Sequence, residues 1–420
     1  MVGACLLLLG ACAGGADAPA VDTIVDPTTT DDPIEWLPCG AVECGTFTVP
    51  VDHTKGQSAA GVVDLVLFRR RAAVAGAPVL VLVGDRTRAD EVDTTWGARA
   101  LAERADLVLG SGARSFEVIS VAMRGSAEMR FPPGSIQMVG SLDVADDLEL
   151  LRREGLKVDT VRVIGWGDGA TAVAAWVMRH PASIEAAVLD SPVDPAVSLA
   201  EQTEALVLAT DAAADWAVRW CASHLSCPGN AKPANTVDLV VGRIEGGTAP
   251  EGFTLAVLAR AAETALSAGN PNLFWEALTE AAEGREDLIS GLAGPVPSIE
   301  DVRPLCRDTG AETARSLLAL LDAADPVYFP VGSVRERLAS CADTLEQARP
   351  IGALPESDSV AGAAVLVTGS ASDPVRPASI MKAMAKRNEW IWKPSPAVRH
   401  LVVGREAVPT AAAMAHLAGN

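Results

Sequence analysis

The chain has 420 residues, 49% of them hydrophobic, which is enough to bury the core of one large domain or of two ordinary ones. Its 34 basic and 54 acidic side chains give a formal charge of −20. A surface this acidic repels nucleic acids and anionic lipid headgroups, so we expect no nucleic-acid partner.

The N-terminus has the pattern of an export signal. Leu6–Leu9 form an apolar stretch that is too short to span a bilayer. The following "LGAC", Leu9–Cys12, resembles a bacterial lipobox, which implies that residues 1–11 are a signal peptide and that Cys12 is lipidated. An ordinary secretory signal with an incidental cysteine is the alternative, because no Lys or Arg precedes the apolar stretch.

Residues 12–32 are rich in Ala, Gly, Asp, Thr and Pro, a composition typical of a flexible tether. Several acyl chains on Cys12 would hold the protein stably at the outer face of the bacterial cytoplasmic membrane, in the cell envelope. Beyond the signal, no apolar run is long enough to predict a membrane span, so the lipid anchor is the only membrane attachment that we expect.

The cysteine pattern favours disulfide bonds. Besides Cys5 and Cys12 the chain contains Cys39, Cys44, Cys221, Cys227, Cys306 and Cys341. An even number in an exported chain favours disulfides, and sequence proximity favours Cys39–Cys44, Cys221–Cys227 and Cys306–Cys341 among about 15 possible pairings. A zinc site is the alternative, but no CxxC or HxxxH spacing supports it. We expect neither a metal nor a cofactor.

Apolar β-branched runs predict buried strands. These runs are Gly61–Arg71, Ala77–Gly84, Phe116–Gly125, Thr160–Gly167, Glu185–Val193, Ala363–Pro374 and Arg399–Gly404. Most are continuously apolar, as are strands buried on both faces of a parallel sheet. Helical patterns at 143–154 and 169–179 alternate with them. This alternation predicts an α/β domain with a mostly parallel, doubly wound sheet.

Residues 199–351 interrupt the alternation. This stretch is rich in Ala, Leu and Glu and is helical by its period. A helical lid inserted into an open sheet explains it, because ligands bind above the carboxyl ends of the strands. The predicted core is therefore divided into 33–198 and 352–420, with the lid between them.

Several segments together resemble one family, the secreted tripeptidyl or prolyl aminopeptidases of the α/β-hydrolase fold. They are "WLPCGAVECGTFTVPVDH" (Trp36–His53), "FEVISVAMRGSA", "SLDVADDLELLRREGL", "DWAVRWCASHLSC" and "SASDPVRP". Their order and spacing cover nearly the whole mature chain. The resemblance implies an α/β-hydrolase fold with a helical lid and a Ser-Asp-His triad in that chain order.

The triad is degenerate in this chain. The family's Gly-x-Ser-x-Gly motif corresponds to Gly165–Gly169, which places Gly167 at the nucleophile position. Asp373 matches the acid. The base position, after the presumed last strand, holds Arg405, whose pKa above about 12 excludes it as a base. An ion pair between Asp373 and Arg405 would preserve the geometry without the chemistry.

The predicted oxyanion loop departs from the family as well. The family has a Gly-rich turn after its "VLVLV" strand, and this chain has "GDRTRADE". Acidic side chains are poorly suited to stabilising an oxyanion. Removing either the serine or the histidine of such a triad removes most of its activity, so we expect a catalytically inactive or impaired homologue, a pseudoenzyme.

Three alternatives remain at the site. Asp168, next to the nucleophile position, is one candidate for an unconventional nucleophile in an active peptidase or esterase. His400 lies in a presumed strand and is interpreted as a core histidine rather than a displaced base. Gly165-x-Gly167-x-x-Ala170 also fits a dinucleotide-binding fingerprint, with Asp190 lying 20 residues after Ala170 as the ribose-binding acid.

The favoured function is that of a binding or scaffold protein with a lidded pocket for a peptide or acyl ligand. Trp166 and Asp168, at the predicted turn, are the candidate ligand-binding residues. Other tryptophans that could line the pocket are Trp96, Trp216, Trp220 and Trp275, although each is individually better explained by core packing.

Overall fold

Nine strands form one sheet in the order β1-β2-β3-β5-β4-β6-β7-β8-β9. Their bounds are β1 Leu37–Cys39, β2 Val42–Pro50, β3 Val62–Arg70, β4 Val79–Val83, β5 Glu117–Val121, β6 Val161–Trp166, β7 Ile184–Asp190, β8 Ala364–Ser370 and β9 Ile391–Ser395. The first three neighbouring pairs, β1·β2, β2·β3 and β3·β5, are antiparallel. The remaining five, β5·β4, β4·β6, β6·β7, β7·β8 and β8·β9, are parallel. The α/β-hydrolase fold predicted from the sequence is confirmed.

This computed structural model describes residues 33–55, 61–85, 97–126, 128–129, 138–228, 232–294, 306–323, 332–342, 349, 363–373, 375–397 and 399–419. The predicted signal peptide, Cys12 and the tether lie outside the described residues. Trp96 and the continuation of the predicted oxyanion loop beyond Asp85 lie outside them as well.

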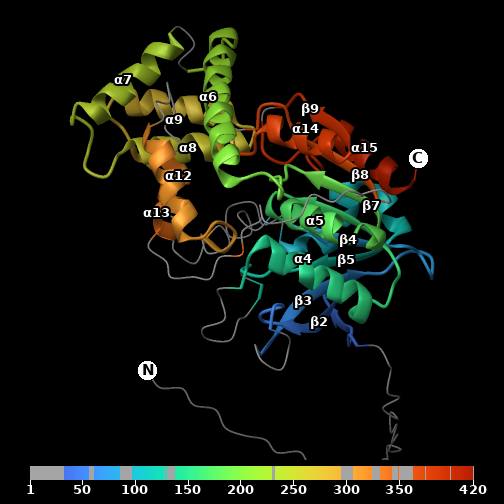
Figure 1. The fold of residues 1–420 in the computed structure, drawn as a ribbon. Helices are drawn as coiled ribbons and strands as arrows, with labels where there is room; N and C mark the ends of the chain where they lie inside the picture. Colours follow the sequence, from blue (N-terminus) through green and yellow to red (C-terminus); the bar gives the residue numbers. More distant parts are fainter. Residues whose placement is uncertain are drawn as a thin grey trace, which may run out of the picture. The chain divides into compact units, whose positions relative to one another are not determined.

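Helices cover both faces of the sheet (Figure 1). Around the sheet these are α2 Ala98–Glu103, α3 Ala105–Leu109, α4 Ser141–Leu150, α5 Asp168–Arg179, α14 Ala378–Arg387 and α15 Ala407–Leu417. Side chains alternate across β4, so Val81 and Val83 pack in one core with α4, α5 and α14, whereas Leu80 and Leu82 pack in a second core with α3 and α15. Two-sided burial explains why the central strands are continuously apolar.

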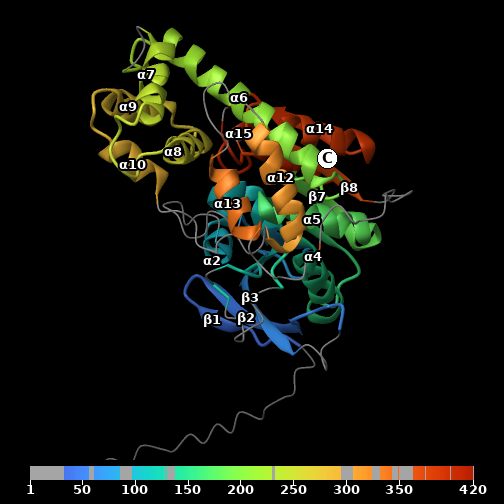
Figure 2. The ribbon, with the colours of Figure 1, turned by 60° about the vertical axis from the view of Figure 1, so that its left-hand side comes forward.

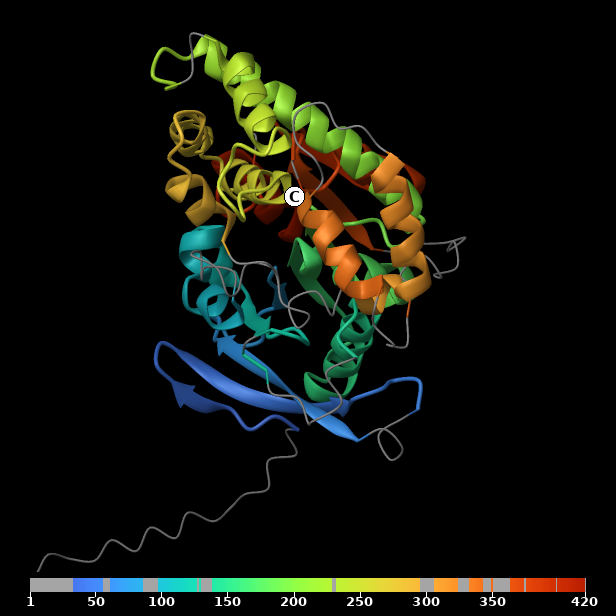
Figure 3. The ribbon, with the colours of Figure 1, turned by 90° about the vertical axis from the view of Figure 1, so that its left-hand side faces the viewer.

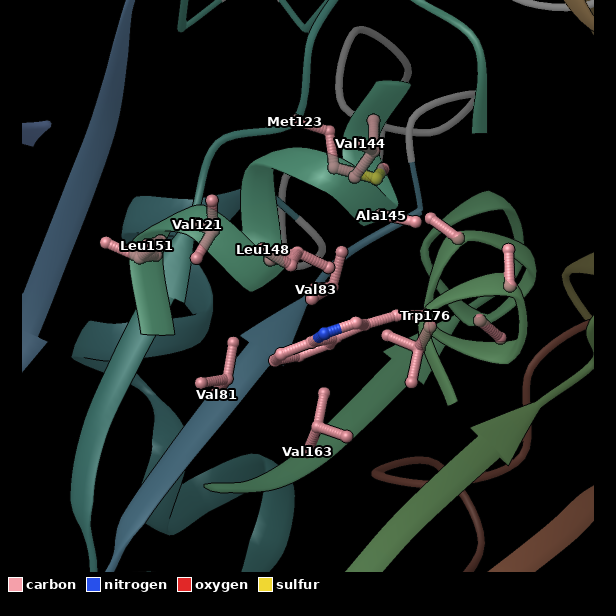
Figure 4. Close-up of a cluster of buried hydrophobic side chains, with 14 of the residues drawn as sticks. Val81, Val83, Val121, Met123, Val144, Ala145, Leu148, Leu151, Val163 and Trp176 are labelled. Carbon is pink, nitrogen blue, oxygen red and sulfur yellow. The ribbon is translucent and has the colours of Figure 1, made fainter. Parts of the chain in front are cut away.

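Trp176 of α5 fills the centre of the first core (Figure 4). Its indole lies between Val81, Val83 and Val163 of the sheet and Leu148 of α4. The ring is fully buried, and its Nε1 donates to the Glu149 carboxylate at 2.9 Å, so its one polar atom is satisfied.

Between β7 and β8, every described element is helical. These are α6 Leu199–Ser223, α7 Pro233–Glu245, α8 Leu255–Ser267, α9 Pro271–Ala282, α10 Asp287–Ala293, α12 Ala311–Ala323 and α13 Gly332–Ala342. We call them the insertion. In the view of Figure 1 they lie above and to the left of the sheet, and Figure 2 shows α12 and α13 near α4 and α5. Among the described residues, no helix combines the length and apolarity needed to cross a bilayer.

Three disulfides join cysteines among the described residues, in the pairs that sequence proximity favours. Cys39–Cys44 joins β1 to β2, Cys221–Cys227 closes the end of α6, and Cys306–Cys341 ties the segment before α12 to α13. Each bridge constrains the unfolded chain and so stabilises the fold, the last one most because it closes the longest loop.

The last strand is not where the apolar pattern placed it. The predicted strand at 399–404 is irregular, and the sheet ends instead with β9, "IWKPS". Leu401 has a φ of +60°, which no extended strand allows. The backbone N–H groups of Val402 and Val403 donate to the Asp190 carboxylate rather than to a neighbouring strand. A buried acceptor has thus replaced sheet pairing for this apolar run.

Candidate functional site

Parallel pairing brings the carboxyl ends of four strands to one edge. Val83 of β4 pairs with Gly165 of β6, and Trp166 of β6 pairs with Asp190, which in turn pairs with β8. The segments that follow these strands begin at this edge, which is where ligands bind in open α/β sheets. They carry Asp85, Gly167, Ser191 and Asp373.

Gly167 forms the sharp turn between β6 and α5, with φ +52° and ψ −115°. A side chain is strained in this conformation, and glycine adopts it freely. Close contacts on either side support the turn, because a Cβ on Gly165 would lie 2.5 Å from the Cα of Ala170. The strand, turn and helix at the predicted nucleophile position are therefore present, without a nucleophilic side chain on Gly167.

Asp85 occupies the space that a side chain on Gly167 would need. A Cβ built on Gly167 would lie 2.5–2.7 Å from the carboxylate atoms of Asp85. Oδ1 of Asp85 accepts a hydrogen bond from the backbone N–H of Asp168 at 3.2 Å. In an α/β-hydrolase, the N–H of the residue after the nucleophile is part of the oxyanion hole. Asp85 therefore fills the nucleophile space and engages an oxyanion donor at once.

His400 lies between two carboxylates. Its Nδ1 is 2.9 Å from Oδ2 of Asp373, and its Nε2 is 3.4 Å from Oδ2 of Asp85. The second distance is long for a hydrogen bond and is better described as an ion-pair contact. Asp85, Asp373 and His400 are 1%, 1% and 2% exposed, so these charges interact with little screening by water.

The charge on His400 follows from this arrangement. Burial alone would lower the pKa of its imidazole, but the carboxylates of Asp373 and Asp85 raise that pKa to about 9. At neutral pH the ring is therefore an imidazolium that hydrogen-bonds Asp373 through Nδ1 and faces Asp85 with Nε2. We call Asp85, His400 and Asp373 the ion cluster.

The base position predicted for Arg405 is corrected by this geometry. The side chain that pairs with Asp373 is His400, which the sequence interpretation assigned to the core. Placing the last strand at 399–404 moved the expected base too far along the chain. Because the sheet ends at Ser395, the segment after the last strand contains His400. Arg405 lies further on, in the turn before α15, where its N–H donates to the carbonyl of Val402.

Asp190 and Trp166 fix the backbone that carries His400. Oδ2 of Asp190 accepts from the N–H groups of Val402 and Val403, each at 2.7 Å, and Trp166 Nε1 donates to the Val403 carbonyl at 3.1 Å. Burial raises the pKa of Asp190 to about 6, and the two backbone hydrogen bonds oppose this rise.

These hydrogen bonds of Trp166 and Asp190 correct two predictions, that Trp166 binds a ligand and that Asp190 binds a ribose. Trp166, predicted to bind ligand, is fully buried in the second core and acts on the His400 segment instead. Both carboxylate oxygens of Asp190 are engaged, since Oδ1 accepts from the Ser191 hydroxyl at 3.1 Å. Asp190 is therefore not placed to bind a ribose, which removes the main support for the dinucleotide interpretation.

Asp168 lies at the turn and forms an ion pair with Arg376. Nη2 of Arg376 is 2.6 Å from Oδ1 of Asp168, and both side chains are about one-fifth exposed. Asp373 holds the backbone that carries Arg376, because its Oδ1 accepts from the N–H groups of Val375 and Arg376. Of the predicted ligand-binding residues, Asp168 is thus the one at the exposed edge of the site, and that role stays a prediction.

The other candidate side chains lie elsewhere. His53 pairs with Asp147 at 2.6 Å, beside the fully buried Arg124. Trp275 is fully buried within the insertion, and Trp216 and Trp220 are half-buried on α6. Among the described residues, no group of three or more His, Cys, Asp or Glu side chains could hold a metal ion.

Sequence reasoning missed Asp85, Arg376 and the role of His400. A signal for Asp85 existed, since an acidic residue follows directly on a buried strand. The chain order Asp373 then His400 also matches the Asp-then-His order of the triad. Neither pattern reveals that the Asp85 carboxylate points into the space beside Gly167.

Comparisons with known proteins found similar solved structures but no matching sequence family. No protein-family model and no curated protein sequence matches the chain. A proline iminopeptidase from Mycobacterium smegmatis is 13% identical, over 89% of this chain and 98% of that one, with a TM-score of 0.48. A probable hydrolytic enzyme from Pseudomonas aeruginosa is 13% identical, over 92% and 94%, with a TM-score of 0.43. A carboxylesterase from Bacillus subtilis is 12% identical, over 93% and 94%, with a TM-score of 0.40.

The sheet, the turn at Gly167 and the insertion together make this chain an α/β-hydrolase-fold protein. This assignment rests on the strand order and the turn of this chain.

Proposed function

We propose that this protein does not carry out serine-type peptide or ester hydrolysis and that it acts as a ligand-binding or scaffold protein. The observation that carries the proposal is the Asp85 carboxylate, which fills the space beside Gly167. A degenerate member of the secreted tripeptidyl or prolyl aminopeptidase branch would have this site. Its ligand would be a peptide or an acyl group, as the resemblance to that family implies.

Three requirements of acyl transfer fail at this site. Gly167 offers no hydroxyl or thiol to attack a carbonyl. The Asp168 N–H, which would stabilise the oxyanion, already donates to Asp85. A carboxylate at that place also repels the negative charge that develops in the transition state. His400, with its pKa raised to about 9, is protonated at neutral pH and is not a general base.

Hydrolysis assays test the proposal directly. The purified protein is incubated with aminoacyl and tripeptidyl fluorogenic amides and with short acyl esters. We expect no turnover above buffer. The double variant Asp85→Gly/Gly167→Ser removes the obstructing carboxylate and supplies a hydroxyl, so we expect slow ester hydrolysis that the further change His400→Gln abolishes. Gly167→Ser alone is the matched control and should stay inactive. Turnover by the unaltered protein that survives His400→Gln and Asp85→Asn would point to another site altogether.

A second candidate is favoured by one observation, the continuous contact from Asp85 through His400 to Asp373. In this case Asp85 is itself the unconventional nucleophile. Carboxylate attack on a peptide or ester carbonyl would form a reactive anhydride, so the fitting substrate is a saturated carbon with a leaving group. A C–O bond forms, and the leaving group departs with its bonding electrons. The ester removes the charge of Asp85, which lowers the pKa of His400 and allows it to take a proton from a water molecule. The water oxygen then bonds to the ester carbonyl carbon of Asp85, the alcohol leaves with a proton, and the carboxylate is restored.

Isotope labelling separates the two candidates. The protein is incubated in ¹⁸O-labelled water with a panel of epoxides and haloalkanes, and the peptide that contains Asp85 is analysed by mass spectrometry. The binding or scaffold function predicts no label. Label in Asp85, together with turnover that Asp85→Asn abolishes, would establish the second candidate instead.

The proposed place of action is the outer face of the cytoplasmic membrane, with Cys12 as the lipid anchor. The support is the sequence "LGAC" before a tether-like segment. In a bacterial host, the protein should fractionate with membranes and incorporate a labelled fatty acid. Cys12→Ser should abolish both, whereas Cys5→Ser, the matched control within the signal, should change neither.

A further inference from the structure

The insertion makes direct contact with the segment that carries His400. The backbone N–H of His400 donates to the carbonyl of Ser267 at 3.0 Å, and Nη2 of Arg399 donates to the carbonyl of Ala268 at 3.0 Å. Ser267 is the last residue of α8 and is fully buried. Figure 3 shows the end of α8, in yellow, beside the red C-terminal part of the chain. The end of α8, which is far away in sequence, therefore hydrogen-bonds to the backbone of His400, one of the three residues of the ion cluster.

The end of α8 is suited to receive these donors. The last carbonyl groups of a helix have no partner within the helix, and the helix dipole makes this end negative. Arg399 brings a positive guanidinium to it and is itself held by Glu406 at 2.9 Å. Gly269 follows with a φ of +71°, and a Cβ there would lie 2.8–2.9 Å from the Arg399 guanidinium. The absence of a side chain on Gly269 allows Arg399 to lie against this turn.

His400 is consequently held from two sides. On one side, Ser267 of the insertion accepts from the backbone N–H of His400. On the other, Asp190 of the core accepts from the N–H groups of Val402 and Val403, which follow His400. Leu401 between them has a φ of +60°, a conformation that this residue type adopts only when its surroundings impose it. The direction of the imidazole toward Asp373 and Asp85 depends on this backbone.

A second attachment holds the insertion against the core. Asp308 accepts from the N–H and the hydroxyl of Ser141, both at 2.8 Å, at the first residue of α4. Arg307 pairs with Asp143 at 3.1 Å. Cys306–Cys341 ties this segment to α13. The insertion is therefore fixed to the core at α4 as well as at the His400 segment.

We propose that the end of α8 is a positioning element for His400, with Arg399 as the residue that couples them. While Ser267 accepts from the backbone N–H of His400 and Ala268 accepts from the Arg399 guanidinium, the imidazole lies between Asp373 and Asp85. Displacement of the end of α8 withdraws the imidazole from these carboxylates. This inference goes beyond the proposed function, because it concerns the geometry of the ion cluster and holds whether or not the site turns over a substrate.

NMR of the histidine ring nitrogens tests the proposal in the full chain. The protein is labelled with ¹⁵N-histidine, His400 is assigned with the variant His400→Gln, and each ring is titrated. In the unaltered protein, the His400 signal should report an imidazolium up to a pH well above the ordinary value of 6.5. Gly269→Ala and Arg399→Gln should each lower the His400 titration midpoint by about one pH unit or more.

Gly247→Ala is the matched control. Gly247 follows α7 with a φ of +67°, close to that of Gly269, but a Cβ there would have nothing within 4 Å. Both alanines incur the same backbone strain, and only Gly269→Ala pushes on Arg399. Since Gly269→Ala could unfold the insertion, Arg399→Gln provides the second, milder probe. An unchanged His400 midpoint in folded Arg399→Gln protein would overturn the proposal. The hydrolysis assays are independent of this result, so the two proposals fail separately.

Discussion

The carboxylate of Asp85 lies where a side chain on Gly167 would begin. A Cβ on Gly167 would come within 2.5–2.7 Å of the Asp85 carboxylate atoms, and Asp85 in turn contacts His400. The glycine at position 167 and the carboxylate of Asp85 are therefore one feature of the site. The glycine leaves the space that the carboxylate occupies.

This relationship predicts a strong coupling between the two positions. Gly167→Ala should lower the free energy of unfolding by about 2–4 kcal/mol, because it adds a clash with Asp85 to the strain of a positive φ. In an Asp85→Gly background the same change should cost about 1 kcal/mol, the strain alone. Urea unfolding of the double-mutant cycle measures this difference.

Gly76→Ala is the control for that cycle. Gly76 has a φ of +77°, and a Cβ there would meet nothing within 4 Å. Its cost should be about 1 kcal/mol, with or without Asp85. Equal costs of Gly167→Ala in both backgrounds would contradict the predicted contact.

His400 should make stability depend on pH in the alkaline range. Its pKa is raised in the folded protein to about 9 from an ordinary value of 6.5, so the imidazolium binds its proton more tightly when folded. The stabilisation is fully present below pH 6.5 and is lost as the pH rises through 9. Relative to His400→Gln, the unaltered protein should lose at most about 3 kcal/mol over this range. Chemical unfolding at a series of pH values measures the difference, and parallel curves for the two proteins would refute it.

Asp190 should make the stability of the fold depend on pH in the acidic range. Burial raises its folded pKa to about 6 from 3.8, so the folded state favours the protonated acid. The contribution is present below pH 3.8 and is lost as the pH rises through 6, at most about 3 kcal/mol. Asp190→Asn keeps an acceptor for Val402 and Val403 and cannot ionise. The unaltered protein should therefore lose stability relative to Asp190→Asn between these pH values, as measured by thermal unfolding. A gain in the stability of the unaltered protein relative to Asp190→Asn over this pH range would show that the backbone hydrogen bonds affect the pKa of Asp190 more than burial does.

Asp308 should hold the insertion to the core. Asp308→Ala removes the acceptor for the N–H and hydroxyl of Ser141 and should cost about 1–3 kcal/mol. Hydrogen exchange should accelerate at the first turn of α4, although the substitution lies in another part of the chain. Thr254→Ala removes the cap of α8, which is also in the insertion, and should leave exchange at α4 unchanged. Unaltered protection of α4 in Asp308→Ala would contradict this attachment.

Much of the architecture was predictable from local patterns. The apolar runs predicted between residues 61 and 193, and the run that begins at Ala363, contain the strands β3 to β8. Continuous apolar residues on strands require burial on both faces, and the sheet supplies it. The turn at Gly165–Gly169 was also predictable, since the glycines there are required by close backbone contacts. The three disulfides join the pairs that sequence proximity favours. Proximity alone brings Cys39 to Cys44 and Cys221 to Cys227, whereas Cys306 and Cys341 are 35 residues apart and are brought together by the fold.

The sequence alone thus determined the class of fold, the position of the turn and the glycine at its centre, because each depends on residues that are neighbours along the chain. Only the tertiary structure decided where the last strand lies and which histidine pairs with Asp373. The run at 399–404 has the composition of a strand, but the buried carboxylate of Asp190 takes its N–H groups. Asp85, Gly167, Asp373 and His400 lie far apart in sequence. Parallel strands bring their carboxyl ends to one edge, and that placement is a property of the sheet rather than of any segment.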